Sequence, residues 1–254
     1  MIEFSLTPDI LLLLFFTGLI AGMVDAIAGG GGLITLPVLL AVGLGPTEAL
    51  ATNKLQGSFG TLSSSLYFIR RNMVKPKEIA FLIGCTFVGS ALGTLLVRHL
   101  NAEFLTRVIP ILLIITALYF WFGPRLREQG TGPKTGTAVF AMTVGAGVGF
   151  YDGFFGPGAG SFFAVGFVGL LGFNLIQATA HTKVLNFTSN FASLLIFALA
   201  GHCVWSVGLV MAAGQLIGAR TGARLVIRKG GRIIRPLIVI VSLLISLKLL
   251  IGPQ

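Results

Sequence analysis

Two stretches of the chain place a carboxylate beside several glycines within otherwise apolar sequence: DAIAGGGG (25–32) and DGFFGPGA (152–159). Glycine loosens a helix, and a bare carboxylate is costly in lipid, so this combination requires an explanation. A helix that breaks and restarts at the glycines directs unpaired N–H groups and the positive end of its dipole at an adjoining cavity, which suits an anion. We therefore predict that four glycines approach a substrate: Gly29, Gly31, Gly156 and Gly158. The alternative is that they only permit close helix packing.

A lysine and a stripe of polar residues follow each glycine-rich stretch. Two sets recur at spacings of three and four, which keeps each set on one helical face: Lys54, Ser58, Thr61 and Ser65, then Lys183, Asn186, Asn190 and Ser193. An ammonium group in a water-excluded cavity attracts an anion. The substrate-binding residues predicted on these helices are Lys54, Lys183, Asn53, Ser58, Asn186 and Asn190. The alternative is that each lysine extends along its helix to the lipid headgroups.

Three titratable residues lie close to these motifs. Asp25 and Asp152 begin the glycine-rich stretches, and His181 precedes Lys183 by two residues. Each is a candidate for proton coupling, although a single histidine is more often an ordinary hydrogen-bonded residue. The two aspartates also fit the proton-sharing dyad of a membrane-embedded aspartyl hydrolase. That alternative is disfavoured, because a matched lysine pair has no role in such a dyad.

The composition places these motifs in a membrane protein. Hydrophobic residues make up 55% of the 254 positions and charged residues only 10%, with a mean hydropathy of +0.95. A soluble domain of this length needs more polar surface, whereas several stretches here reach the roughly 20 apolar residues that cross a bilayer. The chain contains no GxxxxGK[ST] phosphate-binding loop, so we expect no direct ATP drive. We also expect no cofactor and no metal.

The pattern of apolar segments occurs twice. GMVDAIAGGGG (22–32) matches GFYDGFFGPGA (149–159) at an offset of 127 residues, and EALATNK (48–54) matches QATAHTK (177–183) at an offset of 129. GSALG and GARTG match at 129 as well. We predict an all-α polytopic protein of two homologous halves, each with a glycine-interrupted first segment followed by three spanning helices. The predicted units are a first repeat (1–123), a cytoplasmic linker (124–136) and a second repeat (137–254).

The basic residues favour an inverted repeat. If each interrupted segment crosses the membrane once, the halves are parallel and the two faces carry eight and seven lysines and arginines. If it folds back without a net crossing, twelve lie on one face and three on the other. Cytoplasmic loops are rich in Lys and Arg, so the second arrangement is favoured, with both termini outside. The twelve residues are Arg70, Arg71, Lys75, Lys77, Arg125, Arg127, Lys134, Arg224, Arg228, Lys229, Arg232 and Arg235.

The paired motifs resemble those of a known family. DAIAGGGGLITLPVLLAVGL with ALATNKLQ, followed by GFYDGFFGPGAGSFF with ATAHTKVLNFTSN, is similar to the TauE/SafE sulfite exporter family over essentially the whole chain. The resemblance implies a bacterial inner-membrane permease for sulfite, sulfonates or other sulfur-containing anions. It also implies eight spanning helices. The inverted arrangement above differs from this, because in it the interrupted segments are re-entrant and make no net crossing of the membrane.

We predict a secondary transporter for a small anion that works by alternating access about a site between the repeats. Its expected partners are this anion and the lipid bilayer. The net charge of +10 is explained by the topology and anionic lipid, so no nucleic acid is expected. An anion channel using the same cavity is the main alternative, and homo-oligomer formation stays open.

Overall fold

The computed structural model describes residues 7–122 and 130–229, and within these ranges the chain forms helices and no strand. The first half contains α1 (Pro8–Ala28), α2 (Gly31–Ala41), α3 (Pro46–Ile69), the 3-10 helix η1 (Pro76–Ile79), α4 (Ala80–Arg98) and α5 (Ala102–Phe122). The second half contains α6 (Thr137–Phe140), the π-helical turn η2 (Ala141–Gly145), α7 (Ala146–Phe154), α8 (Ala159–Leu170), α9 (Leu175–Leu199) and α10 (Trp205–Lys229). The predicted last segment, 233–251, lies outside the described residues.

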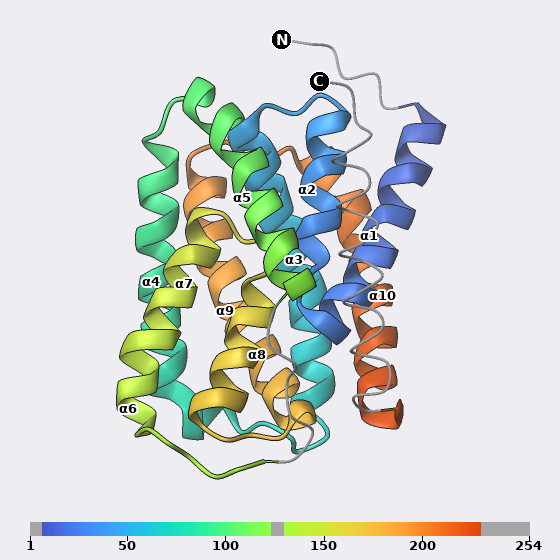
Figure 1. Cartoon of the computed structure of the whole chain (residues 1–254). Coiled ribbons are helices and arrows are strands. Elements are labelled where there is room, and N and C mark those ends of the chain that lie inside the picture. The colour runs from blue at the N-terminus through green and yellow to red at the C-terminus, as the bar shows by residue number, and fades with distance from the viewer. Residues whose placement is uncertain (1–6, 123–129, 230–254) are drawn as a thin grey trace.

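The interrupted first segment folds back in both halves. Figure 1 shows α1 descending from the upper end of the molecule into its interior, where the chain turns and α2 returns to the same end. In the second half, α6, η2 and α7 rise from the lower end, and α8 returns there. α3 then runs downward and α9 upward through the full height of the bundle. The two interruptions therefore enter the bundle from opposite ends.

Helix boundaries differ from the expected ones at three places. The apolar sequence resumes at Leu33 and Ser161, so the sequence predicts that the two helices restart there. α2 instead begins at Gly31 and α8 at Ala159, two residues earlier. Gly31 and Gly32 thus belong to the first turn of α2, whereas Gly29, Gly156 and Gly158 lie in the short connections before the restarted helices. α10 continues through Arg224 to Lys229, beyond the predicted end at Ala223, so the last basic cluster begins on a helix.

The two halves interlock through pairs of parallel helices. Figure 1 shows α1 beside α10 and α4 beside α7, so each first segment lies against a helix of the other half. A Cβ added at Gly89 or Gly93 of α4 would overlap the carbonyl oxygen of Ala146 or Phe150 on α7. The contact residues rise together along both helices, which makes the pair parallel. Cβ atoms at Gly218 and Gly222 of α10 would overlap the carbonyls of α1 in the same way. The glycines of GSALG and GARTG therefore allow close packing between helices.

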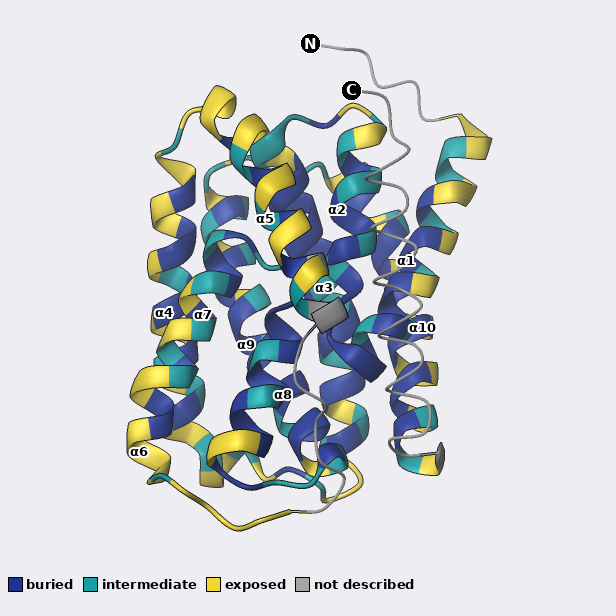
Figure 2. Cartoon of the chain, in the orientation of Figure 1, coloured by how far each residue is buried: buried dark blue, intermediate teal, exposed yellow. Residues whose placement is uncertain are grey.

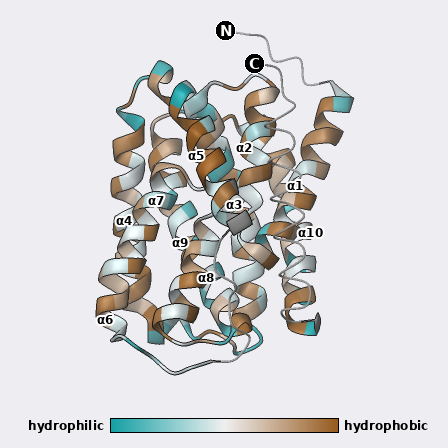
Figure 3. Ribbon diagram, in the orientation of Figure 1, coloured by the Kyte–Doolittle hydropathy of each residue, from teal (hydrophilic) through white to brown (hydrophobic). Residues whose placement is uncertain are grey.

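The outward surface suits lipid. Figure 2 shows exposed positions along the outer faces of α1, α4 and α5, and Figure 3 shows that many of these are hydrophobic. Large exposed apolar side chains on these helices include Leu12, Phe16, Ile20, Phe81, Val88, Leu92, Ile111 and Ile115. Three of the described helical segments are long and apolar enough to cross a membrane: Pro8–Ala28, Pro76–Arg98 and Leu175–Leu199. α3 and α10 are as long but more polar, because they carry buried polar residues or basic ends.

The described basic segments gather at one end of the molecule. The α3–α4 loop, residues 130–136 and the end of α10 all lie at the lower end in Figure 1. Residues 130–136 are fixed there by hydrogen bonds from the Thr131 N–H to the Gly172 carbonyl (3.0 Å) and from the Lys134 N–H to the Leu170 carbonyl (2.8 Å). Arg125, Arg127, Arg232 and Arg235 lie outside the described residues.

We predict that the glycine contacts between helices contribute to stability. Gly89→Ala should destabilise the protein by about 1–3 kcal/mol, because the added methyl overlaps the Ala146 carbonyl on a facing backbone. The matched control is Gly84→Ala on the same helix, where a Cβ meets open space and alanine favours the helix by about 0.5–1 kcal/mol. Thermal unfolding in detergent measures both. Equal melting temperatures would contradict the proposed packing role.

We also predict that the basic end faces the cytoplasm. A cysteine introduced as Thr131→Cys, at an exposed position of this end, should react with a membrane-impermeant thiol reagent only from the inside. A cysteine introduced as Asn101→Cys, at the exposed α4–α5 turn of the opposite end, should react only from the outside. Labelling of the Thr131→Cys variant in intact cells would show the orientation to be wrong.

Candidate functional site

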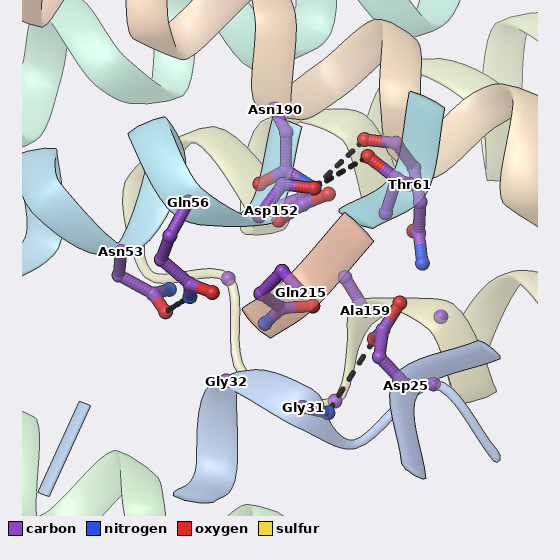
Figure 4. A pocket seen from close by; sticks show the side chains of 16 residues that line it. Asp25, Gly31, Gly32, Asn53, Gln56, Thr61, Asp152, Ala159, Asn190 and Gln215 are labelled. Carbon is purple, nitrogen blue, oxygen red and sulfur yellow. Dashed lines mark hydrogen bonds between the residues drawn. The ribbon is translucent and has the colours of Figure 1, made fainter. Parts of the chain in front are cut away.

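A cavity lies where the two glycine breaks meet. The backbones of Gly29 and Gly160 are so close that a Cβ on Gly29 would lie 2.7 Å from the Gly160 Cα. Beside them, the Ser161 hydroxyl donates a hydrogen bond of 2.5 Å to the Ala28 carbonyl. The cavity above this crossing has a volume of about 410 Å³, part of which is open to solvent. Figure 4 shows polar side chains from several helices around it, among them Asp25, Asn53, Gln56, Asp152, Asn190 and Gln215.

Both restarted helices begin at the cavity wall. Gly29 and Gly156, which the repeat aligns, take positive φ values of 78° and 101° that favour glycine, so the chain can turn sharply before each restart. Gly31 and Gly32 in the first turn of α2, and Ala159 and Gly160 in the first turn of α8, line the cavity. Two positive dipole ends therefore lie at one cavity, as an anion requires.

Each lysine of the polar stripes pairs with the aspartate of the other half. Lys54 Nζ on α3 lies 2.5 Å from Asp152 Oδ1 on α7, and Lys183 Nζ on α9 lies 3.2 Å from Asp25 Oδ2 on α1. Each ammonium group also donates to the backbone carbonyl of its aspartate. Both lysine side chains are only 1% exposed, so they do not extend to the lipid headgroups. Burial of this kind requires a partner, because an unpaired charge in the apolar interior costs several kcal/mol.

The remaining cavity wall carries carboxamides with unused hydrogen-bonding capacity. Asn53 Oδ1 accepts from the Thr35 hydroxyl (2.5 Å) and from Gln56 Nε2 (2.8 Å). Gln56 Oε1 is left buried without a hydrogen-bond partner among the described residues. Asn186 Oδ1 is likewise buried and has no hydrogen-bond partner there. Buried polar atoms normally find partners, so the unpaired oxygens mark a place where a ligand or water completes the network.

Most of the predicted site residues come together here. The four glycines, both aspartates, Asn53, Asn186 and Asn190 all line the cavity. Lys54 lies behind Asp152, and Lys183 lines a second, neighbouring cavity. Ser58 turns its hydroxyl to the Lys54 carbonyl of its own helix (2.7 Å). His181 lies outside both cavities, where Nδ1 is 2.8 Å from the Gln177 carbonyl and the ring packs against Phe173.

Three polar side chains that line the cavity did not figure among the predicted ligands. Thr61 belongs to the polar stripe, and Gln56 stands beside it in the TNKLQGS sequence. Gln215 is an isolated amide in the apolar sequence of α10, and its side chain reaches the space beside Gly22 and Gly60. The sequence feature that could have identified Gln215 as a lining residue is its isolation within an apolar segment, because a buried amide is costly unless it has partners.

The sulfite exporter TauE/SafE family model matches residues 14–249, which is nearly the whole chain. The chain belongs to the TauE/SafE family. It is 51% identical to the "Probable membrane transporter protein YfcA" of Escherichia coli K12, over 97% of this chain and 92% of that protein. A "Probable membrane transporter protein" of Haemophilus influenzae is 47% identical, over 95% and 94%. A more distant relative, the "Probable membrane transporter protein YdhB" of Bacillus subtilis, is 22% identical over 85% and 88%. No solved structure matches the chain.

Membership of the TauE/SafE family decides between the broad classes of function. The chain is a membrane transporter and not an enzyme, so the aspartyl hydrolase alternative is excluded. The geometry agrees with this exclusion, because Asp25 and Asp152 each have their own ammonium partner and do not share a proton with one another.

We predict that the buried ion pairs are needed as pairs. Lys54→Met leaves the Asp152 carboxylate buried without its ammonium and should lower the free energy of unfolding by about 3–5 kcal/mol. Combining it with Asp152→Asn removes both charges and should restore most of the loss. The control is Lys75→Met, which breaks a pair with Glu78 that is 67% exposed on both sides and should change little. A melting temperature for Lys54→Met equal to that of the parent would contradict the pairing.

Proposed function

We propose that the chain is a secondary transporter that carries a small anion, sulfur-containing such as sulfite or an organosulfonate, across the bacterial inner membrane. The observation that supports this most directly is the shared cavity at the N-terminal ends of two broken helices. Such paired interruptions form the binding site in transporters built from inverted repeats. The sulfur-containing substrate is suggested by the family description, and the anionic charge by the cavity itself.

The way in which the cavity recognises an anion follows from its charges. Lys54 and Lys183 are each neutralised by an aspartate, so neither acts as an isolated cation. The favourable terms for an anion are therefore the two helix N-termini and the amide groups of Asn53, Asn186 and Asn190. Preorganised amide dipoles of this kind bind an oxyanion without requiring a net positive charge in the protein.

Alternating access is supported by the interlocked arrangement of the halves. The Leu19 and Met23 carbonyls approached by α10 correspond at an offset of 127 to those of Ala146 and Phe150 approached by α4. The lysine–aspartate pairs correspond in the same way, because each pair joins the lysine of one half to the aspartate of the other half. We propose that these features reflect a pseudo-twofold axis in the membrane plane, and that the inverted halves rock about the cavity. The Gly29–Gly160 crossing, which separates the two cavities, suits a carrier better than an open channel.

Proton coupling would involve the two aspartates. Asp25 and Asp152 both line the cavity and both balance a lysine, so a change in their protonation alters the ion pairs that join the halves. His181 has no such position, because it packs against Phe167 and Phe173 away from the cavities. We propose the aspartates and not His181 as the coupling groups.

We predict uptake of a small anion that shows counterflow. Purified protein in liposomes should accumulate sulfite, an alkanesulfonate or a small carboxylate from a test panel, and preloaded unlabelled anion should accelerate entry of the labelled one. Gly31→Leu should abolish uptake, because even a Cβ there lies 2.7 Å from Asp25 Cβ and 2.8 Å from the Ala21 carbonyl. Gly84→Ala is the matched control and should transport normally. Saturable entry without counterflow would favour the channel, and transport of no anion would reject the proposal.

A further inference from the structure

A second cavity of about 290 Å³ lies on the other side of the glycine crossing, toward the basic end. It shares Gly29 and Gly160 with the main cavity and follows the first turns of α9, where it is lined by Leu175, Thr179, Thr182 and Lys183. These turns are the part of α9 nearest to the lower end in Figure 1. The second cavity therefore lies between the main cavity and the end that carries the basic loops.

The lining of the second cavity suits an anion. Lys183 reaches it with a side chain that is 1% exposed, and Gly160 and Ser161 in the first turn of α8 line it. Thr182 is 1% exposed, and its hydroxyl has no hydrogen-bond partner among the described residues. Thr179, one turn earlier, already donates to the Leu175 carbonyl at 2.8 Å. The cavity thus offers one ammonium, one helix N-terminus and one unused hydroxyl.

The Lys183–Asp25 pair stands between the two cavities, because Asp25 lines the main cavity and Lys183 lines the second. This pair is looser than its counterpart. Its Nζ–Oδ2 distance is 3.2 Å and the Asp25 side chain is 16% exposed, whereas Lys54 and Asp152 are 2.5 Å apart and Asp152 is 4% exposed.

The environment of each carboxylate explains this difference. The second oxygen of Asp152 accepts a hydrogen bond from the Ser189 hydroxyl, but the position that the repeat matches to Ser189 is Gly60, which has no hydroxyl. Within residues 7–122 and 130–229, the second oxygen of Asp25 accepts a hydrogen bond only from the Gly31 N–H, at 3.4 Å. Asp25 is therefore the carboxylate that a competing anion displaces more easily.

We propose that the second cavity is a transit site for the transported anion, which replaces Asp25 at Lys183 as it passes between the main cavity and the basic end. The inference rests on the proposed transport function. It adds a second binding site and a route between the main cavity and the basic end. Lys183 Nζ, the Thr182 hydroxyl and the first turn of α8 hold the anion, while Lys54 and Asp152 stay paired throughout.

The charge preference of the second cavity can be tested without measuring transport. Ala164→Cys places a thiol on its wall, in a protein whose own cysteines are removed by Cys85→Ser and Cys203→Ser. In inside-out vesicles, the rate of each reagent is compared with its own rate toward a free thiol in solution, because the cationic reagent reacts faster with any thiolate. On this scale, the anionic 2-sulfonatoethyl methanethiosulfonate should be favoured about tenfold over the cationic 2-(trimethylammonio)ethyl reagent, because Lys183 lines the second cavity and its partner carboxylate does not. Equal rates, or no reaction from this side, would overturn the proposal.

Matched double variants assign the preference to one ion pair. Lys183→Met combined with Asp25→Asn removes the pair between the cavities without leaving an unpaired charge, and should abolish the preference for the anionic reagent. Lys54→Met combined with Asp152→Asn makes the same change in the other pair and should leave the preference intact. The single variant Asp25→Asn should increase it, because Lys183 is then free of its carboxylate. The same loss in both double variants would contradict a specific role for Lys183.

The unused hydroxyl gives a further test. Methanesulfonate should slow modification of the thiol introduced by Ala164→Cys, and adding Thr182→Val should weaken this protection about tenfold, equivalent to about 1.4 kcal/mol. Thr179→Val is the control, because that hydroxyl is already bonded within its helix. Absence of protection would reject the transit site. If the liposomes carry no anion but the charge preference persists, the transport proposal fails while the binding site stands.

Discussion

The arrangement of the molecule depends on two buried lysine–aspartate pairs that each join one half of the chain to the other. An ammonium or carboxylate in an apolar interior is stable only when a partner is in contact and its remaining hydrogen bonds are satisfied. Each aspartate stands one turn before a glycine break, and its lysine partner lies on the second helix after the break of the other half, α3 for Lys54 and α9 for Lys183. Satisfying both pairs together brings the two breaks to one place, and the cavity forms between them. The cavity between the halves is therefore a consequence of the same contacts that stabilise the fold.

Close packing of the helices makes this pairing feasible. Glycines on α4 and α10 let the backbones of α7 and α1 approach until a methyl group would overlap a carbonyl oxygen. The carboxylates on α1 and α7 are thereby held within reach of lysines on α9 and α3. Without a hydrophobic effect between helices in lipid, such small-residue contacts supply much of the packing energy. The glycines of the breaks have a different task, since Gly29 and Gly156 turn the chain and start a new helix at the cavity.

The sequence predicted the components of the site better than their connections. An aspartate beside glycines and a lysine heading a polar stripe each indicate burial and function, because both are costly in lipid. Nothing in the spacing of these residues distinguishes pairing within a half from pairing between halves. Only the structure shows that Lys54 and Lys183 each pair with the aspartate of the other half. Ser58 shared the spacing of the stripe, but a serine in a helix can bond its own backbone, and this one bonds the Lys54 carbonyl. Gln215 lay outside every repeated motif, and only the contact between α1 and α10 brings it to the cavity.

The balance of charge at the cavities has an electrical consequence. Among the described residues, two lysines and two aspartates cancel there, so the protein supplies no counter-charge that travels with the substrate. An anion that crosses alone then moves its full charge through the membrane potential, which contributes about 2.3 kcal/mol per elementary charge for every 100 mV. In a cell whose interior is negative, this term drives the anion outward. Accumulation of the anion inside the cell then requires coupling to another gradient, for example through accompanying cations, and the voltage dependence of transport reports the net charge that moves.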